Sequence, residues 1–320
     1  MLKLTDTPDF FQEIYNRLPK GSIYMVGGWV RDSLLGIRSK DYDMATPYDP
    51  NVLAKMLKQA FPGMDEVMID KEHIRFGVLK VWYNTYDYEI TTFREEIYTP
   101  GNRKPKVTYT TDILTDLKRR DFTINAMAFD GEKIIDPYDG QGDLAAKELN
   151  PVGKTWAETY SEDPTRILRA SRLAATLGFT FAYDPADNFG CYWPSTHIHN
   201  LVNLSPQILR KNFEKAWESF TVLTKEGKRS VKAMISDYIS NGFVKYIVPF
   251  GHRRRFPEFV NYTDLQPDEA WFLLLWTCIH DHNESAEFNL TLLKKSMTMM
   301  GESKADIEKA QNTVKENNYV

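Results

Sequence analysis

The sequence has few of the features that mark secreted, disulfide-bonded or membrane proteins. Its 320 residues include two cysteines, Cys191 and Cys278, which are too few for a disulfide framework and have no metal-ligand spacing. The most apolar stretch, residues 270–279, is too short to cross a bilayer. The first ten residues lack the basic-then-apolar order of a signal peptide. These absences predict a cytoplasmic protein with no membrane partner.

A strong charge of either sign is also absent, because the formal net charge is −4 at pH 7. Taken alone, this value argues against a nucleic-acid partner. The charge is unevenly distributed, however, and residues 201–260 contain eleven Lys and Arg against five Asp and Glu. Such a segment would attract a polyanion to one face of the protein, although a solvated helical surface would account for the same charges.

The spacing of apolar residues predicts an α/β N-terminal part and a largely helical C-terminal part. Amphipathic helices are predicted for residues 5–20 and 51–61, and strands for residues 23–26, 66–69, 75–83 and 86–93. Residues 95–111 are polar and interrupted by proline and glycine, which predicts a mobile loop. Residues 216–320 are mostly helical by pattern.

The stretch from Ile23 to Thr46 carries the first chemical signal. An apolar strand leads into Gly27-Gly28, where backbone N–H groups are open to an anion because no Cβ intervenes. A short helix follows and closes at Gly36, which has the position of a C-terminal cap. Arg31 on this helix adds a fork of donors, so the turn predicts a phosphate site.

Two carboxylates follow within the same stretch. Asp41 and Asp43 alternate with Tyr42 and Met44, so in a strand they point to one face while their neighbours point to the core. Carboxylates beside a phosphate-binding turn suit Mg²⁺-dependent phosphoryl or nucleotidyl transfer. A glycine pair or an Asp-x-Asp alone would be uninformative, and the prediction depends on their combination.

A third carboxylate is predicted on a later strand. Asp87 and Glu89 share one face of the strand at 86–93, and a nucleotidyl-transfer site commonly adds a carboxylate to the first two. The alternatives are that Asp87 is an exposed strand end and that Glu89 pairs structurally with an arginine.

Two further polar blocks follow along the chain. In the first, Arg120, Asp121 and Asn125 combine a phosphate clamp with groups that suit ribose hydroxyls, although a salt-bridge network would fit equally well. In the second, Asp163 and Pro164 open a helix along which arginines recur every third residue. These arginines are Arg166, Arg169 and Arg172. A helix cap with solvent-facing arginines is the structural alternative.

Together these blocks resemble the class II tRNA nucleotidyltransferase (CCA-adding) and bacterial poly(A) polymerase family of the polymerase-β nucleotidyltransferase superfamily. The matching elements are the glycine turn with Asp-x-Asp, the block RRDFTINAMA at 119–128, and EDPTRILRASR at 162–172. The resemblance covers residues 20–180, a little over half of the chain. It implies an α/β catalytic head, with a mixed β-sheet backed by helices, followed by an all-α neck, body and tail.

The resemblance also implies domain boundaries and roles. The head would span residues 1–145, the neck 146–205 and the RNA-binding body and tail 206–320. Asp41 and Asp43 would hold two Mg²⁺ ions, and Glu89 would assist as a third catalytic carboxylate. Nucleotide binding would involve a set of head and neck residues. These are Gly28, Arg31, Arg120, Asp121, Asn125, Asp163, Arg166, Arg169 and Arg172.

The implied reaction is template-independent addition of CMP and AMP, from CTP and ATP, to the 3′ end of tRNA with release of pyrophosphate. Asp163 and Arg166 would read the edges of the incoming base in place of a template. The alternatives are a poly(A) polymerase, an enzyme that adds part of CCA, and a non-catalytic RNA-binding relative. The chain departs from the family pattern at residues 102–105, which lack the usual acidic residue, and in the helix at 205–215.

Overall fold

The computed structural model describes most of the N-terminal half of the chain and parts of the remainder. The described residues are 7–39, 42–62, 71–83, 86–99, 102–183, 204–225, 286–300 and 302–316, with 227, 230, 234, 266, 267, 270–272 and 275. The chain divides into two compact units, Met1–Thr155 (unit 1) and Trp156–Val320 (unit 2). Among the described residues, no helix is long and apolar enough to span a membrane.

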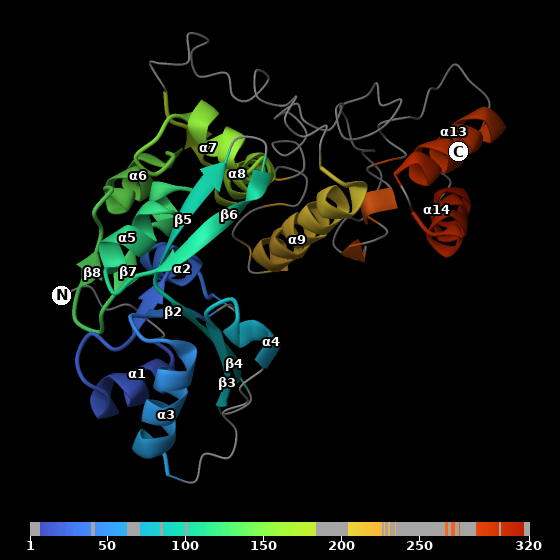
Figure 1. Ribbon diagram of the computed structural model, residues 1–320. Helices are drawn as coiled ribbons and strands as arrows, with labels where there is room; N and C mark the ends of the chain where they lie inside the picture. Colours follow the sequence, from blue (N-terminus) through green and yellow to red (C-terminus); the bar gives the residue numbers. More distant parts are fainter. Residues whose placement is uncertain are drawn as a thin grey trace. The chain divides into compact units, whose positions relative to one another are not determined.

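A six-stranded mixed sheet forms the centre of unit 1 (Figure 1). Its strand order is β3-β4-β2-β1-β7-β8, and only β2 and β4 are parallel neighbours. The strands are β1 Tyr24–Val26, β2 Asp43–Thr46, β3 Val78–Tyr83, β4 Tyr86–Thr92, β7 Ala128–Phe129 and β8 Ile134–Ile135. The strands predicted at 23–26, 75–83 and 86–93 are therefore confirmed, while residues 66–69 lie outside the described residues.

Helices α1 (Asp9–Arg17) and α3 (Pro50–Ala60) cover one face of the sheet (Figure 1). Phe10 of α1 is fully buried, and its ring lies 4.7 Å from that of Tyr88 on β4. Helix α3 begins where Asp49 accepts a hydrogen bond from the Asn51 N–H, and Pro50 fits the first turn. Both helices match the sequence predictions within a few residues at each end.

The opposite sheet face packs on α5 (Ile113–Lys118). The hydrophobic core on this face contains Val26, Ala45 and Ala128 of three strands, together with Phe93 and with Leu117 of α5. Because side chains alternate along a strand, Asp43 shares this face with Ala45. Asp43 therefore lies on the sheet face that packs on α5, and the residues that follow α5 lie on the same side.

Residues 94–109 correct one sequence prediction. Instead of a loop, they form an antiparallel ribbon of β5 (Arg94–Thr99) and β6 (Asn102–Tyr109). Burial alternates along β5, which is the period of a strand with one packed face. Pro105 is tolerated because this two-stranded ribbon has free edges and a register irregularity between Ile97 and Thr99.

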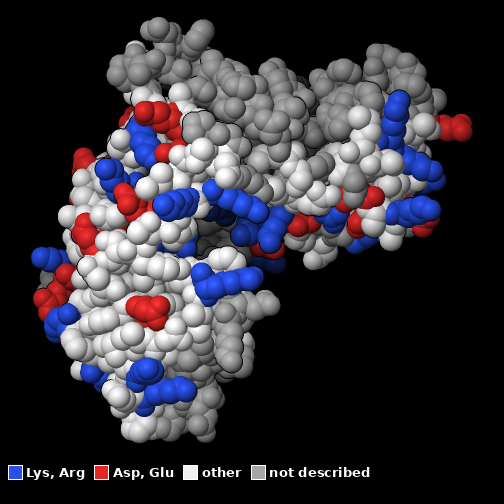
Figure 2. Space-filling view, viewed as in Figure 1, with Lys and Arg blue, Asp and Glu red and all other residues white. Residues whose placement is uncertain are grey.

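The remaining elements of unit 1 connect these layers. They are α2 (Gly28–Leu34), α4 (Lys71–Ile74), the 3₁₀ turn η1 (Thr123–Asn125), α6 (Gly140–Ala146) and β9 (Glu148–Leu149). Helix α6 begins at residues whose backbone N–H groups donate to Asp136. Lys/Arg and Asp/Glu side chains are interspersed over the visible surface of unit 1 (Figure 2).

Helices dominate the described part of unit 2. They are α7 (Trp156–Glu162), α8 (Thr165–Leu177), α9 (Pro206–Lys225), α13 (Ala286–Met299) and α14 (Lys304–Glu316), with a two-residue strand, β10 (Thr180–Phe181). Helix α8 packs against α9. Three aromatic residues along one side of α9, Phe213, Trp217 and Phe220, are buried. An α/β part followed by a helical part is thus confirmed. The boundaries at 145 and 205 stay predictions.

Candidate active site

The glycine turn joins β1 to α2. Gly27 has φ of +69°, a backbone conformation that side chains with a Cβ rarely adopt, and its N–H donates to the Met127 carbonyl at 3.2 Å. Helix α2 begins at Gly28 directly after the turn, and the predicted cap Gly36 has φ of +65°. The predicted strand–turn–helix is therefore present, and the first turn of α2 lies beside Gly27.

Two of the predicted catalytic carboxylates are neighbours across the sheet. In the parallel pairing of β2 with β4, Asp43 is the register partner of Glu89. Paired residues on adjacent strands point to the same face, and both of these residues are exposed. Asp41 lies outside the described residues. The structure thus brings Asp43 and Glu89 together, whereas the position of Asp41 stays a prediction.

Arg120 lies against the glycine turn. A Cβ built on Gly27 would come within 2.8 Å of Arg120 Nη1, so the glycine leaves the space that this guanidinium occupies. Arg120 Nη2 donates to Asp116 Oδ2 at 3.1 Å, and Arg120 Nε is buried without a hydrogen-bond partner in the described structure. Burial lowers the pKa of Arg120, and the carboxylates of Asp116 and Asp43 oppose that shift.

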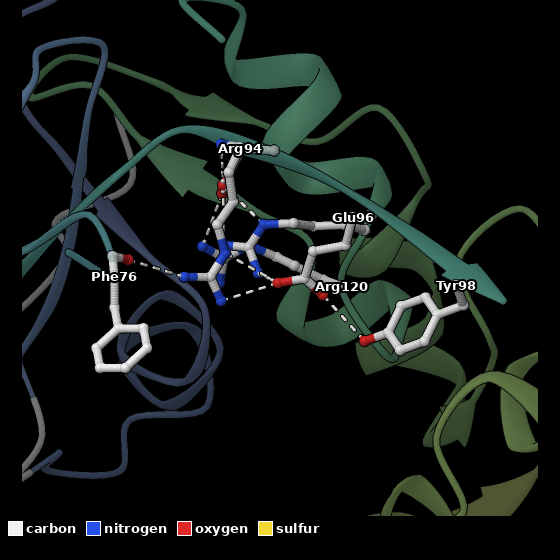
Figure 3. A network of polar contacts seen from close by, with 7 residues as sticks. Phe76, Arg94, Glu96, Tyr98 and Arg120 are labelled. Atoms are coloured by element: carbon white, nitrogen blue, oxygen red, sulfur yellow. Dashed lines mark hydrogen bonds and ion pairs between the residues drawn. The ribbon is translucent and has the colours of Figure 1, made fainter. Parts of the chain in front are cut away.

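A network of arginines and carboxylates surrounds Arg120 (Figure 3). Arg119 bridges two acids, with Nη2 at 2.8 Å from Asp116 Oδ1 and Nη1 at 3.1 Å from Glu96 Oε1. Glu96 also accepts from Arg94 Nε at 2.9 Å and from the Tyr98 hydroxyl at 3.0 Å. Sequence reasoning assigned no role to Glu96 or Asp116.

Arg31 is linked to the 3₁₀ turn at 123–125. Its Nη1 donates to Asn125 Oδ1 at 2.6 Å, and its Nη2 lies 2.7 Å from Asp32 Oδ1. Asn125 in turn donates to Asp121 Oδ1 at 3.1 Å. The structure therefore places the predicted residues Arg31, Asn125 and Asp121 in one hydrogen-bonded chain beside the glycine turn.

The predicted base-reading residues lie in unit 2, at the junction of α7 and α8. Asp163 accepts from the Thr165 N–H at 3.0 Å and from its hydroxyl at 2.8 Å. Arg166 is buried, and its Nη1 lies 2.8 Å from Glu162 Oε2. Arg169 on the same helix is exposed and Arg172 is partly buried. Arg166 thus has a protein carboxylate as a partner, one helical turn before it.

The predicted basic surface at 201–260 lies largely outside the described residues. Arg210, one of its members on α9, forms ion pairs with Glu214 at 2.8 Å and with Glu302. These pairs raise the pKa of Arg210 even though burial acts to lower it. Arg210 therefore joins α9 to the segment before α14, and an RNA-binding role for the basic segment stays a prediction.

The paired residues Asp43 and Glu89, on two inner strands of the sheet, suit a hard divalent cation. Carboxylate oxygens are the ligands that Mg²⁺ prefers, and Asp43 and Glu89 supply them from paired positions. Within the described part of the chain, no group of three or more His, Cys, Asp or Glu is clustered for a metal. Because Asp41 is not among these residues, the described acids form part of the predicted site.

Comparison with known proteins places the sheet and its blocks in a family. A model described as the poly(A) polymerase head domain matches residues 23–150. This range includes the glycine turn, Asp43, Glu89 and the block at 119–128.

Curated relatives share the same region. The chain is 36% identical over 249 residues to a CCA-adding enzyme of Streptococcus suis, covering 75% of this chain and 56% of the relative. It is 46% identical over 158 residues to a CCA-adding enzyme of Lactococcus lactis, covering 49% of this chain and 38% of the relative. The chain thus spans about half the length of the curated relatives it matches.

Solved structures extend the likeness of fold. The Bacillus stearothermophilus CCA-adding enzyme in complex with CTP matches with a TM-score of 0.64 at 22% identity, covering 97% of this chain and 71% of that chain. The Thermotoga maritima CCA-adding enzyme complexed with tRNA_CCA matches with a TM-score of 0.59 at 20% identity, covering 98% and 68%. The solved structures show a shared fold, and from the sequence relatives and the head-domain match the chain belongs to the class II tRNA nucleotidyltransferase and bacterial poly(A) polymerase family.

Proposed function

We propose that the chain is a template-independent RNA nucleotidyltransferase that adds CMP and AMP, from CTP and ATP, to the 3′ end of tRNA. The observation that carries the proposal is the pairing of Asp43 with Glu89 on adjacent parallel strands. Both side chains lie on the sheet face toward Arg120, and Arg120 lies against the glycine turn. Carboxylates for a metal and arginines for phosphate thereby adjoin one another. The curated relatives are named CCA-adding enzymes, and a solved structure of similar fold is a CCA-adding enzyme complexed with tRNA_CCA, which supports the choice of tRNA.

Each group has a part in this reaction. Arg120 and Arg31 would bind the triphosphate, and Arg120 has a buried Nε donor still without a partner in the described structure. Asp121 and Asn125 would orient the ribose. Asp41, Asp43 and Glu89 would hold Mg²⁺, which supplies charge stabilisation for transfer of the nucleotidyl group to the RNA 3′-hydroxyl and for departure of pyrophosphate.

The residues of unit 2 would select the base. Asp163 offers an acceptor and Arg166 offers donors, and these are the groups needed to distinguish base edges. Arg169 and Arg172 would contact phosphate or the RNA end. In the structure Arg166 is paired with Glu162, so base recognition would require the guanidinium to exchange this partner for the base.

Incorporation of labelled nucleotides tests the proposal. The purified chain is incubated with tRNA transcripts that lack CCA, and one triphosphate is labelled in each reaction. Parallel reactions contain either Mg²⁺ or a chelator. Incorporation of CMP first, and of AMP only after CMP, with loss of both in chelator, is the expected result. Absence of incorporation under all conditions would contradict it.

A poly(A) polymerase is the second candidate, favoured by two observations. The matching family model carries that name, and residues 102–105, at the start of β6, lack the acidic residue that the family resemblance leads us to expect there. This alternative predicts repeated addition of AMP to a transcript that already ends in CCA. The same assay, supplied with ATP alone, distinguishes the two reactions.

A further inference from the structure

A continuous series of charged contacts connects Glu96 on the β5–β6 ribbon to Arg120 (Figure 3), which lies against the glycine turn. Glu96 on β5 lies 3.1 Å from Arg119, Arg119 lies 2.8 Å from Asp116, and Asp116 lies 3.1 Å from Arg120. Arg120 Nη1 then borders the space above Gly27. Every contact joins opposite charges, so a displacement at one end of the series changes the electrostatic balance at the other.

We propose that Glu96 is a positioning residue for Arg120, acting through Arg119 and Asp116, so that the β5–β6 ribbon sets how this guanidinium faces a bound triphosphate. The inference rests on the proposed function of unit 1 as a nucleotidyltransferase site. Glu96 itself is not a catalytic residue, because its contacts are with Arg94, Tyr98 and Arg119.

The burial of the network supports a positioning role. The Asp116 side chain is 1% exposed and that of Glu96 is 8% exposed, whereas Arg119 and Arg120 are 15% and 16% exposed. Ion pairs at such depth are weakly screened by water and salt, so the loss of one partner is felt by the others. The exposed pair of Arg17 with Glu13, 46% and 40% exposed, lacks this property.

The charge count explains how the effect would travel. Three guanidinium groups, of Arg94, Arg119 and Arg120, share two carboxylates, of Glu96 and Asp116. If Glu96 loses its charge, Arg119 keeps Asp116 as its remaining anion in the network. Asp116 then divides its charge between Arg119 and Arg120 less favourably for Arg120. The guanidinium beside Gly27 would shift, although no atom of Glu96 touches it.

A double-mutant cycle tests this route. Glu96→Gln and Arg120→Lys are made singly and together, and kcat and KM for CTP are measured on tRNA lacking CCA. We expect Glu96→Gln to lower kcat/KM about tenfold in the native background and less than about twofold in the Arg120→Lys background, since residues in one network are not additive. A merely structural role would give the same factor in both backgrounds, and that result would overturn the inference.

Two controls separate this result from loss of folding or loss of the proposed activity. Glu13→Gln removes an exposed ion pair of similar length and should leave kcat/KM unchanged in both backgrounds. The same cycle is repeated on equilibrium binding of CTP, which needs no turnover. Coupling between Glu96 and Arg120 in CTP binding supports the inference even if the chain adds no nucleotide, and additive effects on CTP binding overturn it.

Discussion

Asp43 on β2 and Glu89 on β4 occupy paired positions on adjacent parallel strands. Two like charges held side by side repel, which destabilises the sheet unless a cation or a cationic side chain lies between them. Asp43 is close enough to Arg120 for its charge to oppose the burial that lowers the pKa of that arginine. In the proposed function, Mg²⁺ would offset the repulsion of this pair together with Arg120.

Replacement of Asp43 tests the metal role directly. Asp43→Asn keeps the size of the side chain and removes one of two neighbouring carboxylates. We expect nucleotide incorporation to fall by at least about 10²–10³-fold, as for the loss of a principal electrostatic stabiliser. Thermal stability in the absence of Mg²⁺ should not fall, because repulsion from Glu89 is relieved. Incorporation at the native rate would rule out Asp43 as a metal ligand.

Gly27→Ala should impair activity more than Gly36→Ala. Both glycines have positive φ, so each change costs about 1–3 kcal/mol of folding free energy, which chemical denaturation measures. A new Cβ at Gly27 would meet Arg120 Nη1 at 2.8 Å, whereas the space at Gly36 is open within 4 Å. Nucleotide incorporation should therefore fall only for Gly27→Ala. Equal losses for both variants would show that backbone strain alone is responsible.

Replacement of Arg166 should alter which nucleotide is added more than how fast any nucleotide is added. An unpaired buried donor or acceptor costs about 1–3 kcal/mol, which is enough to erase discrimination of tenfold or more between bases. Single incorporation with each of the four triphosphates measures this for Arg166→Ala.

Glu162→Gln is the matched control for that experiment. It removes the charged partner of Arg166 but keeps the guanidinium, which lies 2.8 Å from the carboxylate in the structure. Base choice should survive in this variant. If Arg166→Ala leaves the ratios among the four triphosphates unchanged, even with a slower rate, then the ion pair of α7 and α8 is structural and the arginine does not read the base.

Acid should destabilise unit 1 partly through Asp116. Burial raises the pKa of this carboxyl, but Arg120 and Arg119 outweigh burial and hold the pKa below its usual value. Because the pKa of Asp116 is lower in the folded chain than in the unfolded chain, its charge stabilises the fold at pH values above the unfolded pKa of about 3.9. This stabilisation is lost as pH falls through the folded pKa. Denaturation of Asp116→Asn should thus depend less on pH below about 4 than that of the native chain. Parallel curves for the two proteins would contradict the assignment.

Local patterns in the sequence predicted much of unit 1. The strand at Tyr24–Val26, the turn at Gly27 and the end of the helix near Gly36 follow from apolar alternation and glycine placement, which act over a few residues. The sequence predicted that Asp43 and Glu89 serve one site, but it did not predict that they are paired across adjacent strands. Strand order depends on contacts between residues far apart in the chain. The structure supplies that register.

The ribbon at 94–109 shows why sequence reasoning fell short. Its polar composition and its proline favoured a loop, but Glu96 pairs with Arg119, a partner more than twenty residues away. The pairs of Asp116 with Arg119 and Arg120, and of Glu162 with Arg166, have the three- and four-residue spacing typical of helices. That spacing is a signal that could have identified Asp116 and Glu162 from the sequence.

Determination of the product made on tRNA tests the central proposal most directly. A tRNA transcript that ends at the discriminator base is incubated with the chain, Mg²⁺ and all four triphosphates, and the mass of its 3′ fragment is measured. The proposed function predicts the gain of two CMP residues and then one AMP residue, with no further extension. A 3′ fragment of unchanged mass, or one extended by a long run of AMP, would contradict it.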